Sequence, residues 1–344
     1  MTDFTDFPLM LNLLFFAVAA AAVWWAGTRL ALYADAISDI SGLGSAFVGM
    51  ILLGGITSLP EIAVSVSAGF SGEAALAVNN LLGSIALQIV VIAMGDYVLG
   101  GRALSFVVGK PRVLLQGVFG AMLLAILIAA VGVGDFAILG AGVWSFGLFM
   151  MAGGLLWFVS RESKRKSGWE PTGFPDLGDA IEPQGKPETI KRALSLTFGV
   201  AVVILMAGFI LARTGDAIAQ QSGLGTSFIG VTLIGFATSL PEISTLLAAV
   251  RLRRYMMAFG DIFGTNILNI ALIFLIDLAY PGPPVINEVG AFSQVAAALG
   301  ILLTLLYVSG LIERRDETAG RLGIDSWAVL IVYFTGIMML YTLR

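Results

Sequence analysis

One nine-residue motif occurs twice in this chain, each time inside strongly apolar sequence. The first copy is Gly54-Gly55-Ile56-Thr57-Ser58-Leu59-Pro60-Glu61-Ile62, and the second, 181 residues later, is Gly235-Phe236-Ala237-Thr238-Ser239-Leu240-Pro241-Glu242-Ile243. Each copy sets a carboxylate beside a proline, which interrupts helical hydrogen bonding. An ionisable side chain at membrane depth is costly and indicates a functional site. Its duplication is typical of a transporter whose ion site lies where two related halves meet.

The composition limits both the class of protein and its chemistry. Hydrophobic residues make up 58% of the 344 residues and charged residues only 12%, against about 25% charged in soluble domains. The chain has no cysteine and no histidine, which excludes disulfides, thiolate metal sites and the usual zinc ligand. Carboxylates, amides, hydroxyls and carbonyls remain, and these suit hard cations such as Ca²⁺, Na⁺ and Mg²⁺. We therefore expect an all-α integral membrane protein that is not an enzyme, with membrane lipid and ions as partners, no cofactor and no nucleic acid.

Ten apolar segments are long enough to span a bilayer, which needs about 20 residues each. The acidic start of the chain favours a first transmembrane helix over a cleaved leader. A charged, proline-rich stretch, 161–189, separates a first five-helix repeat (1–160) from a second one (190–344). The predicted segments are 8–33, 45–70, 74–99, 112–132, 136–160, 190–213, 226–250, 255–279, 288–312 and 322–343.

The basic residues and the repeat predict the orientation. With the N-terminus outside, 17 of the 19 Lys and Arg residues fall in connections on one side, which the positive-inside rule assigns to the cytoplasm. In the plasma or inner membrane of the cell, both termini are then external and the linker is cytoplasmic. Aligning 35–62 with 216–243 gives 17 identities in 28 positions. Five segments separate equivalent points, so the second copy enters from the opposite face, as in an inverted-topology repeat.

The motifs predict that helices 2 and 7 are broken. Pro60 and Pro241 each remove a backbone N–H, and nearby glycines lower the cost of unwinding. Irregular backbone at this depth is tolerated where protein or a wet cavity covers it. We expect carbonyl, hydroxyl and carboxylate oxygens to converge there, as a Ca²⁺ shell of about six to eight oxygens requires. The candidate ligands are Glu61, Thr57, Ser58 and the carbonyl near Gly54, with Glu242, Thr238, Ser239 and the carbonyl near Gly235.

The helix after each motif carries a polar stripe. Residues spaced by four share one helical face, and small glycine neighbours permit close packing. The stripes are Asn80-Ser84-Gln88 in 74–99 and Asp261-Thr265-Asn269 in 255–279. The alternative is hydrogen bonding between helices without ion contact, and Asn80 and Asp261 lie a turn or two from the other candidates.

The paired Thr-Ser-Leu-Pro-Glu segments, each followed by Gly-Ser or Gly-Thr, resemble the alpha repeats of the Ca²⁺/cation antiporter superfamily, most closely its sodium/calcium exchanger branch. The resemblance covers nearly the whole chain. It implies that Glu61 and Glu242 are the central ligands, assisted by Thr57, Ser58, Thr238, Ser239 and the Gly54 and Gly235 carbonyls. It also implies Na⁺-ligating roles for Ser84 and Thr265, with Gln88 and Asn269 at amide or carboxylate positions. The first repeat departs from the exchanger pattern, because Leu81-Leu82-Gly83-Ser84-Ile85 resembles the cation/proton branch.

The predicted activity is antiport of Ca²⁺ against Na⁺ by alternating access at a central carboxylate site. Two like charges in a low dielectric repel, so the site should rearrange only after ions neutralise it. The principal alternative is a Ca²⁺/H⁺ antiporter that uses the same glutamates. An intramembrane hydrolase leaves the repeated Thr-Ser-Leu-Pro unexplained, and a channel fits two symmetric kinks less well than an occluded site.

Two further pairs of acidic residues follow the 181-residue offset. They are Asp35 with Asp216 and Asp96 with Asp277, and all four lie near the ends of predicted segments. We interpret them mainly as interfacial caps or loop contacts, with a minor role in ion entry.

Overall fold

The computed structural model describes most of the chain as helix. The described residues are 4–108, 111–138, 140–162, 185–222 and 236–342. Within them, eight helices are long and apolar enough to cross a membrane, or nine if a bent pair counts as one span. The chain is thus an all-helical, multi-pass membrane protein, as predicted. The expected segment 226–250 begins outside the described residues, and only its second part is seen.

The elements, in chain order, are the following. They are η1 (Phe4–Asp6), α1 (Leu9–Ser41), α2 (Ser45–Val48), the π-helical turn η2 (Gly49–Leu53), α3 (Gly54–Thr57), α4 (Leu59–Phe70), α5 (Ala74–Leu99), α6 (Leu104–Val107), α7 (Pro111–Val133), β1 (Ala137–Ile138), β2 (Ala141–Gly142), α8 (Val143–Glu162), α9 (Ile190–Gln221), α11 (Leu240–Arg251), α12 (Tyr255–Ala279), η3 (Val285–Glu288), α13 (Ala291–Glu313), β3 (Thr318–Ala319), β4 (Leu322–Gly323) and α14 (Ile324–Thr342).

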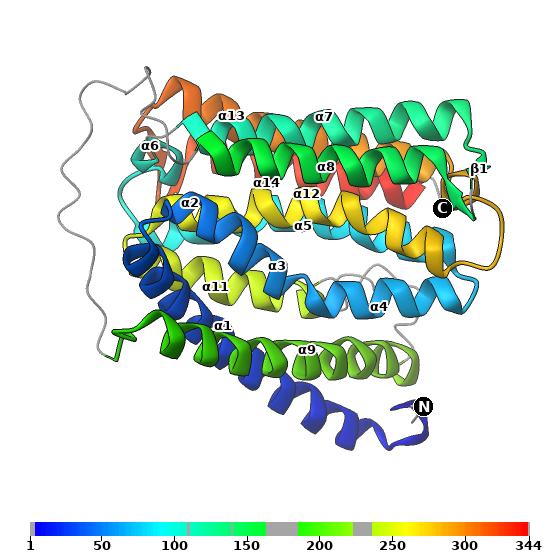
Figure 1. The fold of residues 1–344 in the computed structure, drawn as a ribbon, viewed down its shortest axis with the longest axis horizontal. Coiled ribbons are helices and arrows are strands. Elements are labelled where there is room, and N and C mark those ends of the chain that lie inside the picture. Colours follow the sequence, from blue (N-terminus) through cyan, green and yellow to red (C-terminus); the bar gives the residue numbers. More distant parts are fainter. Residues whose placement is uncertain (1–3, 109–110, 139, 163–184, 223–235, 343–344) are drawn as a thin grey trace.

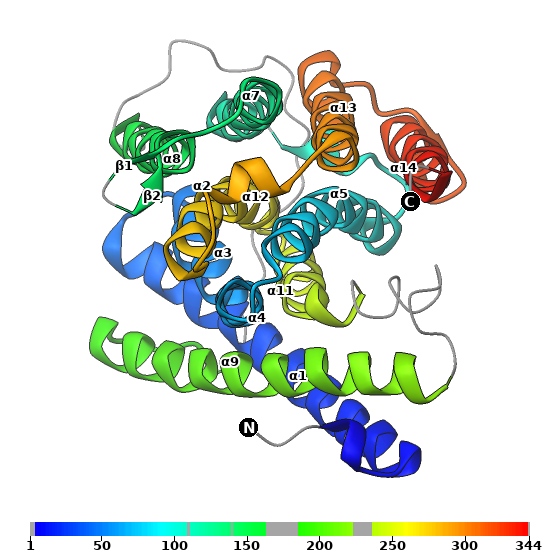
Figure 2. The ribbon, with the colours of Figure 1, turned by 90° about the vertical axis from the view of Figure 1, so that its right-hand side faces the viewer.

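The helices form three layers (Figures 1 and 2). Helices α1 and α9 cross each other in an outer layer that packs against α11 and α4 of the middle layer. The middle layer holds α5 and α12 with the shorter helices α2, α3, α4 and α11. Helices α7, α8, α13 and α14 cover the far side. The two helices with the predicted polar stripes therefore lie at the centre of the molecule.

The helix limits agree with the sequence in the middle layer and differ in the outer one. Helices α5 and α12 begin and end where the sequence predicts. Helix α1 continues to Ser41, well past the predicted end at residue 33, and α9 continues to Gln221 instead of residue 213. The prediction stopped where polar residues begin, but these polar residues have partners in the fold. Helix α1 ends at Gly42, whose φ of +67° suits glycine.

Close glycine contacts hold α12 against the first part of the broken helix. A Cβ on Gly49 would lie 2.3 Å from the Met257 carbonyl oxygen, and one on Gly264 would lie 2.6 Å from Met50 Cα. A Cβ on Gly54 would lie 2.9 Å from Thr265 Oγ1. Because only glycine permits backbones to approach this closely, these contacts set the first motif directly beside the stripe of α12.

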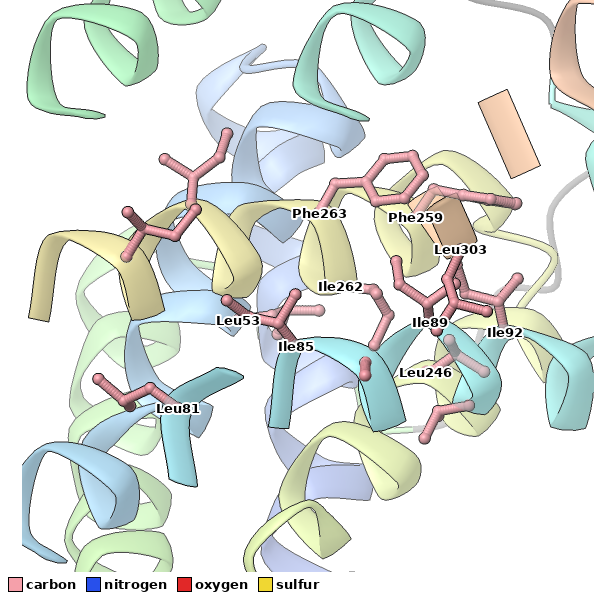
Figure 3. Close-up of a cluster of buried hydrophobic side chains, with 14 of the residues drawn as sticks. Leu53, Leu81, Ile85, Ile89, Ile92, Leu246, Phe259, Ile262, Phe263 and Leu303 are labelled. Atoms are coloured by element: carbon pink, nitrogen blue, oxygen red, sulfur yellow. The ribbon is translucent and has the colours of Figure 1, made fainter. Parts of the chain in front are cut away.

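An apolar cluster fills the space between α5 and α12 (Figure 3). Ile85 and Ile89 of α5 lie beside Ile262 of α12, with Leu246 of α11 close by. These side chains alternate along the helices with Ser84, Gln88 and the other stripe residues. Burial of this cluster fixes the two helices in register and so positions the polar stripes.

Asp277, at the end of α12, joins three groups that are distant in sequence. Its Oδ2 accepts hydrogen bonds from Gly142 N at 2.5 Å and Ser145 Oγ at 2.6 Å. Its Oδ1 accepts from Val285 N at 2.7 Å. The carboxylate thus ties α12 to the β1–β2 hairpin and to the start of α8. We call this set of bonds the Asp277 clamp.

Asp96, at the end of α5, forms the matching Asp96 clamp. It accepts from Gly323 N at 2.7 Å, from Ser326 Oγ at 2.6 Å and from Leu104 N. Each partner lies 181 residues from its counterpart in the Asp277 clamp, and the hairpins β1–β2 and β3–β4 show the same offset. Both aspartates therefore cap helix starts and loop residues, as predicted, and each joins one half of the chain to the other.

Candidate ion-binding site

The first motif forms a bent helix whose break falls at Ser58. Ser45–Thr57 and Leu59–Phe70 meet at an angle of 46°, and Pro60 lies in the first turn of α4. The proline lacks an N–H, so it fits the first turn of a new helix better than the interior of an old one. Glu61 follows in that first turn and is fully buried. The sequence predicted this break, but not the π-helical turn of η2 before it.

The hydroxyls of the first motif point back to the Gly54 carbonyl. Ser58 Oγ donates to Gly54 O at 2.7 Å and Thr57 Oγ1 donates to it at 3.4 Å. The Gly54 carbonyl, which the sequence named as a candidate ligand, also accepts from Ser58 N at 3.1 Å, so these donors occupy it. A hydroxyl that gives its proton to a carbonyl keeps its lone pairs for a cation, so both hydroxyls are suited to ligation.

The second motif repeats this arrangement as far as the structure describes it. Phe236–Thr238 are helical, Ser239 is a turn and Pro241 lies in the first turn of α11. Thr238, Ser239 and Glu242 are buried. Within the part of the chain that the structure describes, both oxygens of the Glu242 carboxylate and the Ser239 hydroxyl have no hydrogen-bond partner. Gly235 lies outside the described residues.

The stripes of α5 and α12 supply further buried polar groups. Gln88 Nε2 donates to Glu61 Oε1 at 3.3 Å, and Ser84 faces the same carboxylate. On α12, Thr265 and Asn269 are fully buried. Among the residues that the structure describes, the Thr265 hydroxyl and both amide atoms of Asn269 have no hydrogen-bond partner.

The two glutamates come together in the middle layer. Glu61 and Glu242 lie close enough for their carboxylates to interact directly, and Thr57 faces Glu242. Buried polar atoms in folded proteins are nearly always paired, so a cluster of unpaired oxygens here indicates room for a cation. Among the described residues, no group of three or more acidic side chains is arranged as a metal cluster. The donor set is two carboxylates supplemented by hydroxyls and amides, which suits a hard cation.

Asn80 and Asp261 differ in burial. Asn80 is half-buried, and its amide nitrogen has no hydrogen-bond partner within the described residues. Asp261 is fully buried and interacts electrostatically with both glutamates. Its Oδ2 accepts from Thr245 Oγ1 at 2.5 Å, whereas its Oδ1 has no partner. Asp261 thus adds a third carboxylate near the pair.

Two polar residues of this region were not among the sequence candidates. Thr245 lies three residues after Glu242 on α11 and binds Asp261. Asn266 is buried with both amide atoms unpaired. Their signals were present, since Thr245 lies one turn beyond the motif and Asn266 directly follows Thr265. Neither has a polar counterpart in the first repeat, where Val64 and Ile85 occupy the equivalent positions.

A comparison with protein families matches nearly the whole chain outside the linker. The family described as sodium/calcium exchanger protein matches residues 11–160 and 192–343. The chain belongs to this family. Members exchange Na⁺ and Ca²⁺ across membranes, so the protein is a transporter of the antiporter type.

Curated relatives cover most of the chain at moderate identity. The inner membrane protein YrbG of Escherichia coli is 26% identical over 310 residues, covering 88% of this chain and 89% of YrbG. CaxA of Alkalimonas amylolytica is 25% identical over 334 residues, covering 95% of this chain and 98% of CaxA. The sodium/calcium exchanger MaX1 of Methanosarcina acetivorans is 31% identical over 117 residues, 34% of this chain and 33% of MaX1.

Solved structures of the sodium-calcium exchanger NCX_Mj have the same fold. One soaked with 100 mM Na⁺ and 10 mM Sr²⁺ superposes with a TM-score of 0.72 at 17% identity, covering 96% of this chain and 99% of that one. Another, soaked with zero Na⁺ and Ca²⁺, gives 0.68 at 18% identity, covering 98% and 100%. At this identity, the likeness establishes the fold.

Proposed function

We propose that this chain exchanges Ca²⁺ for Na⁺ by alternating access at a central site built around Glu61 and Glu242. The observation that carries the proposal is the meeting of two buried glutamates, each one residue after a motif proline, among polar atoms that have no hydrogen-bond partner within the described residues. Membership of the sodium/calcium exchanger family supports the choice of ions.

The charge balance explains why ions must be exchanged. Two facing carboxylates carry a charge of −2, which one Ca²⁺ or more than one Na⁺ neutralises. An empty site would bury like charges in low dielectric, so its rearrangement is disfavoured. The protein therefore changes conformation only with ions bound. After it has carried one kind of ion across the membrane, the site returns to the first side with the other kind of ion bound.

The ligand set follows from the donors. Glu61 and Glu242 supply carboxylate oxygens, and hydroxyls come from the residues before each proline. Ser84, Thr265, Gln88 and Asn269 complete the shell from the stripes, and Asn80 and Asp261 act at its edge. The full proposed set is Glu61, Glu242, Thr57, Ser58, Thr238, Ser239, the carbonyls at Gly54 and Gly235, Ser84, Thr265, Gln88, Asn269, Asn80 and Asp261.

The architecture we propose is ten spans in two inverted five-helix repeats, 1–160 and 190–344. The matching 181-residue offsets of the two clamps and of the two hairpins support it. With 17 of 19 basic residues on one side, the linker 161–189 faces the cytoplasm and both termini face outward in the plasma or inner membrane.

The moving part of the protein is the outer pair, α1 and α9. These two helices form their own layer (Figure 2). In each of them, a glycine lies against the proline of one of the two motifs. A Cβ on Gly27 of α1 would lie 3.3 Å from the Pro241 carbonyl oxygen, and one on Gly208 of α9 would lie 2.4 Å from Pro60 Cγ. Sliding of this pair across the kinks opens the site to each side in turn.

A Ca²⁺/H⁺ antiporter is the second candidate, and one observation favours it. Asp261 is a third buried carboxylate beside the glutamates, and Gln88 and Asn269 add no charge of their own. Protons can neutralise such a group as readily as Na⁺. The ligands of the divalent cation are the same in both cases, and only the coupling ion differs.

Uptake of radioactive calcium into proteoliposomes tests both candidates. Vesicles carry an outward gradient of Na⁺, of H⁺ or of K⁺ as a control, and the wild type is compared with Glu61→Gln. We expect the Na⁺ gradient to drive uptake and Glu61→Gln to reduce it by about 100-fold or more, because a buried ion pair partner is worth about 3–5 kcal/mol.

The matched control is Glu73→Gln, the same substitution at an exposed residue just before α5. Its uptake should equal that of the wild type. Uptake driven by the H⁺ gradient alone would select the Ca²⁺/H⁺ antiporter. Full exchange by Glu61→Gln would refute the central site.

A further inference from the structure

Four charged side chains meet at the end of α1 and the start of α12. Arg254, the N-cap residue of α12, pairs with Asp35 and lies 3.0 Å from Asp39 Oδ2. Lys186, just before α9, lies 2.9 Å from Asp35 Oδ2 and 2.5 Å from Asp39 Oδ2. The Asp35 side chain is fully buried, and the Arg254 and Lys186 side chains are only 19% and 16% exposed. We call these four residues the inner latch.

The inner latch joins the outer helix pair to the rest of the protein. Asp35 and Asp39 belong to α1, and Lys186 lies four residues before the start of α9 at Ile190. Arg254 belongs to α12, which glycine contacts and the Asp277 clamp fix in the middle layer. Any sliding of α1 and α9 relative to α12 that opens this end must separate Arg254 from the two aspartates.

The opposite end of the molecule has no such latch among the described residues. The positions 181 residues from Asp35, Asp39 and Arg254 are Asp216, Gln220 and Glu73. Asp216 and Glu73 are exposed acids, and Gln220 Nε2 donates to Asp216 Oδ2 at 3.0 Å within α9. One hydrogen bond, from Arg213 Nη2 to Ser67 Oγ at 3.2 Å, links α9 to α4 at this end.

We infer that the inner latch holds the cytoplasmic side closed and so biases the exchanger toward its outward-open state. The inference rests on the proposed function and its topology. Opening the inner side takes Arg254 away from the buried Asp35 carboxylate, which is unfavourable. Opening the outer side breaks no ion pair between described residues. A conformational equilibrium follows such a difference in interactions between its two states, so a symmetric fold acquires a preferred direction of opening.

The absence of cysteine from the chain allows a single reporter thiol. Ser244 lies two residues beyond Glu242 toward the latch end of α11, and its side chain rests against Gly27 of α1, where a Cβ would lie 1.8 Å from Ser244 Oγ. We expect Ser244→Cys to be covered by α1 in the outward-open state and uncovered when the inner side opens.

The experiment measures the labelling rate of Ser244→Cys by a charged, membrane-impermeant thiol reagent. Inside-out and right-side-out vesicles are compared for the parent, for Arg254→Gln and for Lys186→Gln. We expect Arg254→Gln to label about tenfold faster from the cytoplasmic side, because it loses the partly buried ion pair that joins α1 to α12. Lys186→Gln removes ion pairs within the moving layer and should label nearly like the parent. Labelling from the outer side should not increase. Arg251→Gln, an exposed residue at the same end of α11, removes the same charge and should label like the parent.

A second measurement avoids the reporter. In the cysteine-free protein, Arg254→Gln should need less Ca²⁺ than the parent on the inner side for half-maximal exchange and more on the outer side. Unchanged labelling and unchanged affinities would refute the latch while leaving the Glu61→Gln result, and hence the proposed function, intact. Equal acceleration from both sides would also refute it, since that indicates general loosening.

Discussion

Replacement of Gly208 by alanine tests whether α9 slides across the Pro60 kink. A Cβ at this position would lie 2.4 Å from Pro60 Cγ and 2.8 Å from Pro60 Cβ. Non-bonded carbons are comfortable at about 3.5–4.0 Å, so α9 must retreat by about 1 Å. The proline ring is rigid and next to Glu61, so it yields little.

The expected cost follows from this overlap. Overpacking of a tight contact costs about 1–3 kcal/mol, and a strain of that size that changes along the transport cycle slows turnover about 5- to 150-fold. Turnover is measured as Na⁺-driven calcium uptake at saturating Ca²⁺, and the affinity for Ca²⁺ is measured separately by calorimetry. We expect turnover to fall by this factor and the affinity to change less than about threefold.

Two other glycines provide a graded series. Gly27→Ala, at the equivalent place on α1, meets the Ser244 hydroxyl, which can rotate away, so its effect should be smaller. Gly199→Ala lies on α9 with nothing within 4 Å and should match the wild type. Equal turnover of Gly208→Ala and Gly199→Ala would refute the sliding of α9 over Pro60.

Three further outcomes are expected. Asp96→Asn and Asp277→Asn should each destabilise the protein by about 2–3 kcal/mol, because an amide cannot accept from three donors as a carboxylate does. Thermal unfolding in detergent should show similar losses of stability for both variants. Asp316→Asn, at a more exposed aspartate, should lose little stability. Gln116→Leu should raise the melting temperature. Among the described residues, this buried amide donates only to the weakly accepting Met50 Sδ, and its oxygen has no hydrogen-bond partner. A lower melting temperature would show that the amide has another role. In protein held at a Ca²⁺ concentration of about 100 times Kd, removing the Ca²⁺ with a chelator should lower the stability of the wild type by about 2.7 kcal/mol. The stability of Glu61→Gln should fall much less. An equal loss in both proteins would contradict binding at Glu61.

The sequence predicted the parts of the fold that depend on local chemistry. Pro60 fixes the break in the first motif because its missing N–H acts within one turn. The limits of α5 and α12 follow from continuous apolar sequence between polar ends. The stripes on these helices were visible because helical spacing puts residues four apart on one face.

Features that depend on distant partners were not predictable in this way. Helix α1 continues through Asp35 and Asp39 because Arg254, more than 200 residues away, pairs with them. The partners of Asp96 and Asp277 lie in the opposite half of the chain, and no periodicity reveals them. The Gly54 carbonyl was named as a candidate ligand, and the sequence did not show that the Thr57 and Ser58 hydroxyls would donate to it.

The Asp96 clamp also constrains the order in which this protein can assemble. Two of its three donors, Gly323 and Ser326, come 227 and 230 residues after the aspartate. During synthesis, α5 therefore enters the bilayer with a carboxylate for which two of the three donors have not yet been made. The Asp96 clamp on α5 cannot be completed until α14 is inserted. The nascent helices must therefore remain loosely packed, and accessible to chaperones and proteases, until translation is nearly complete.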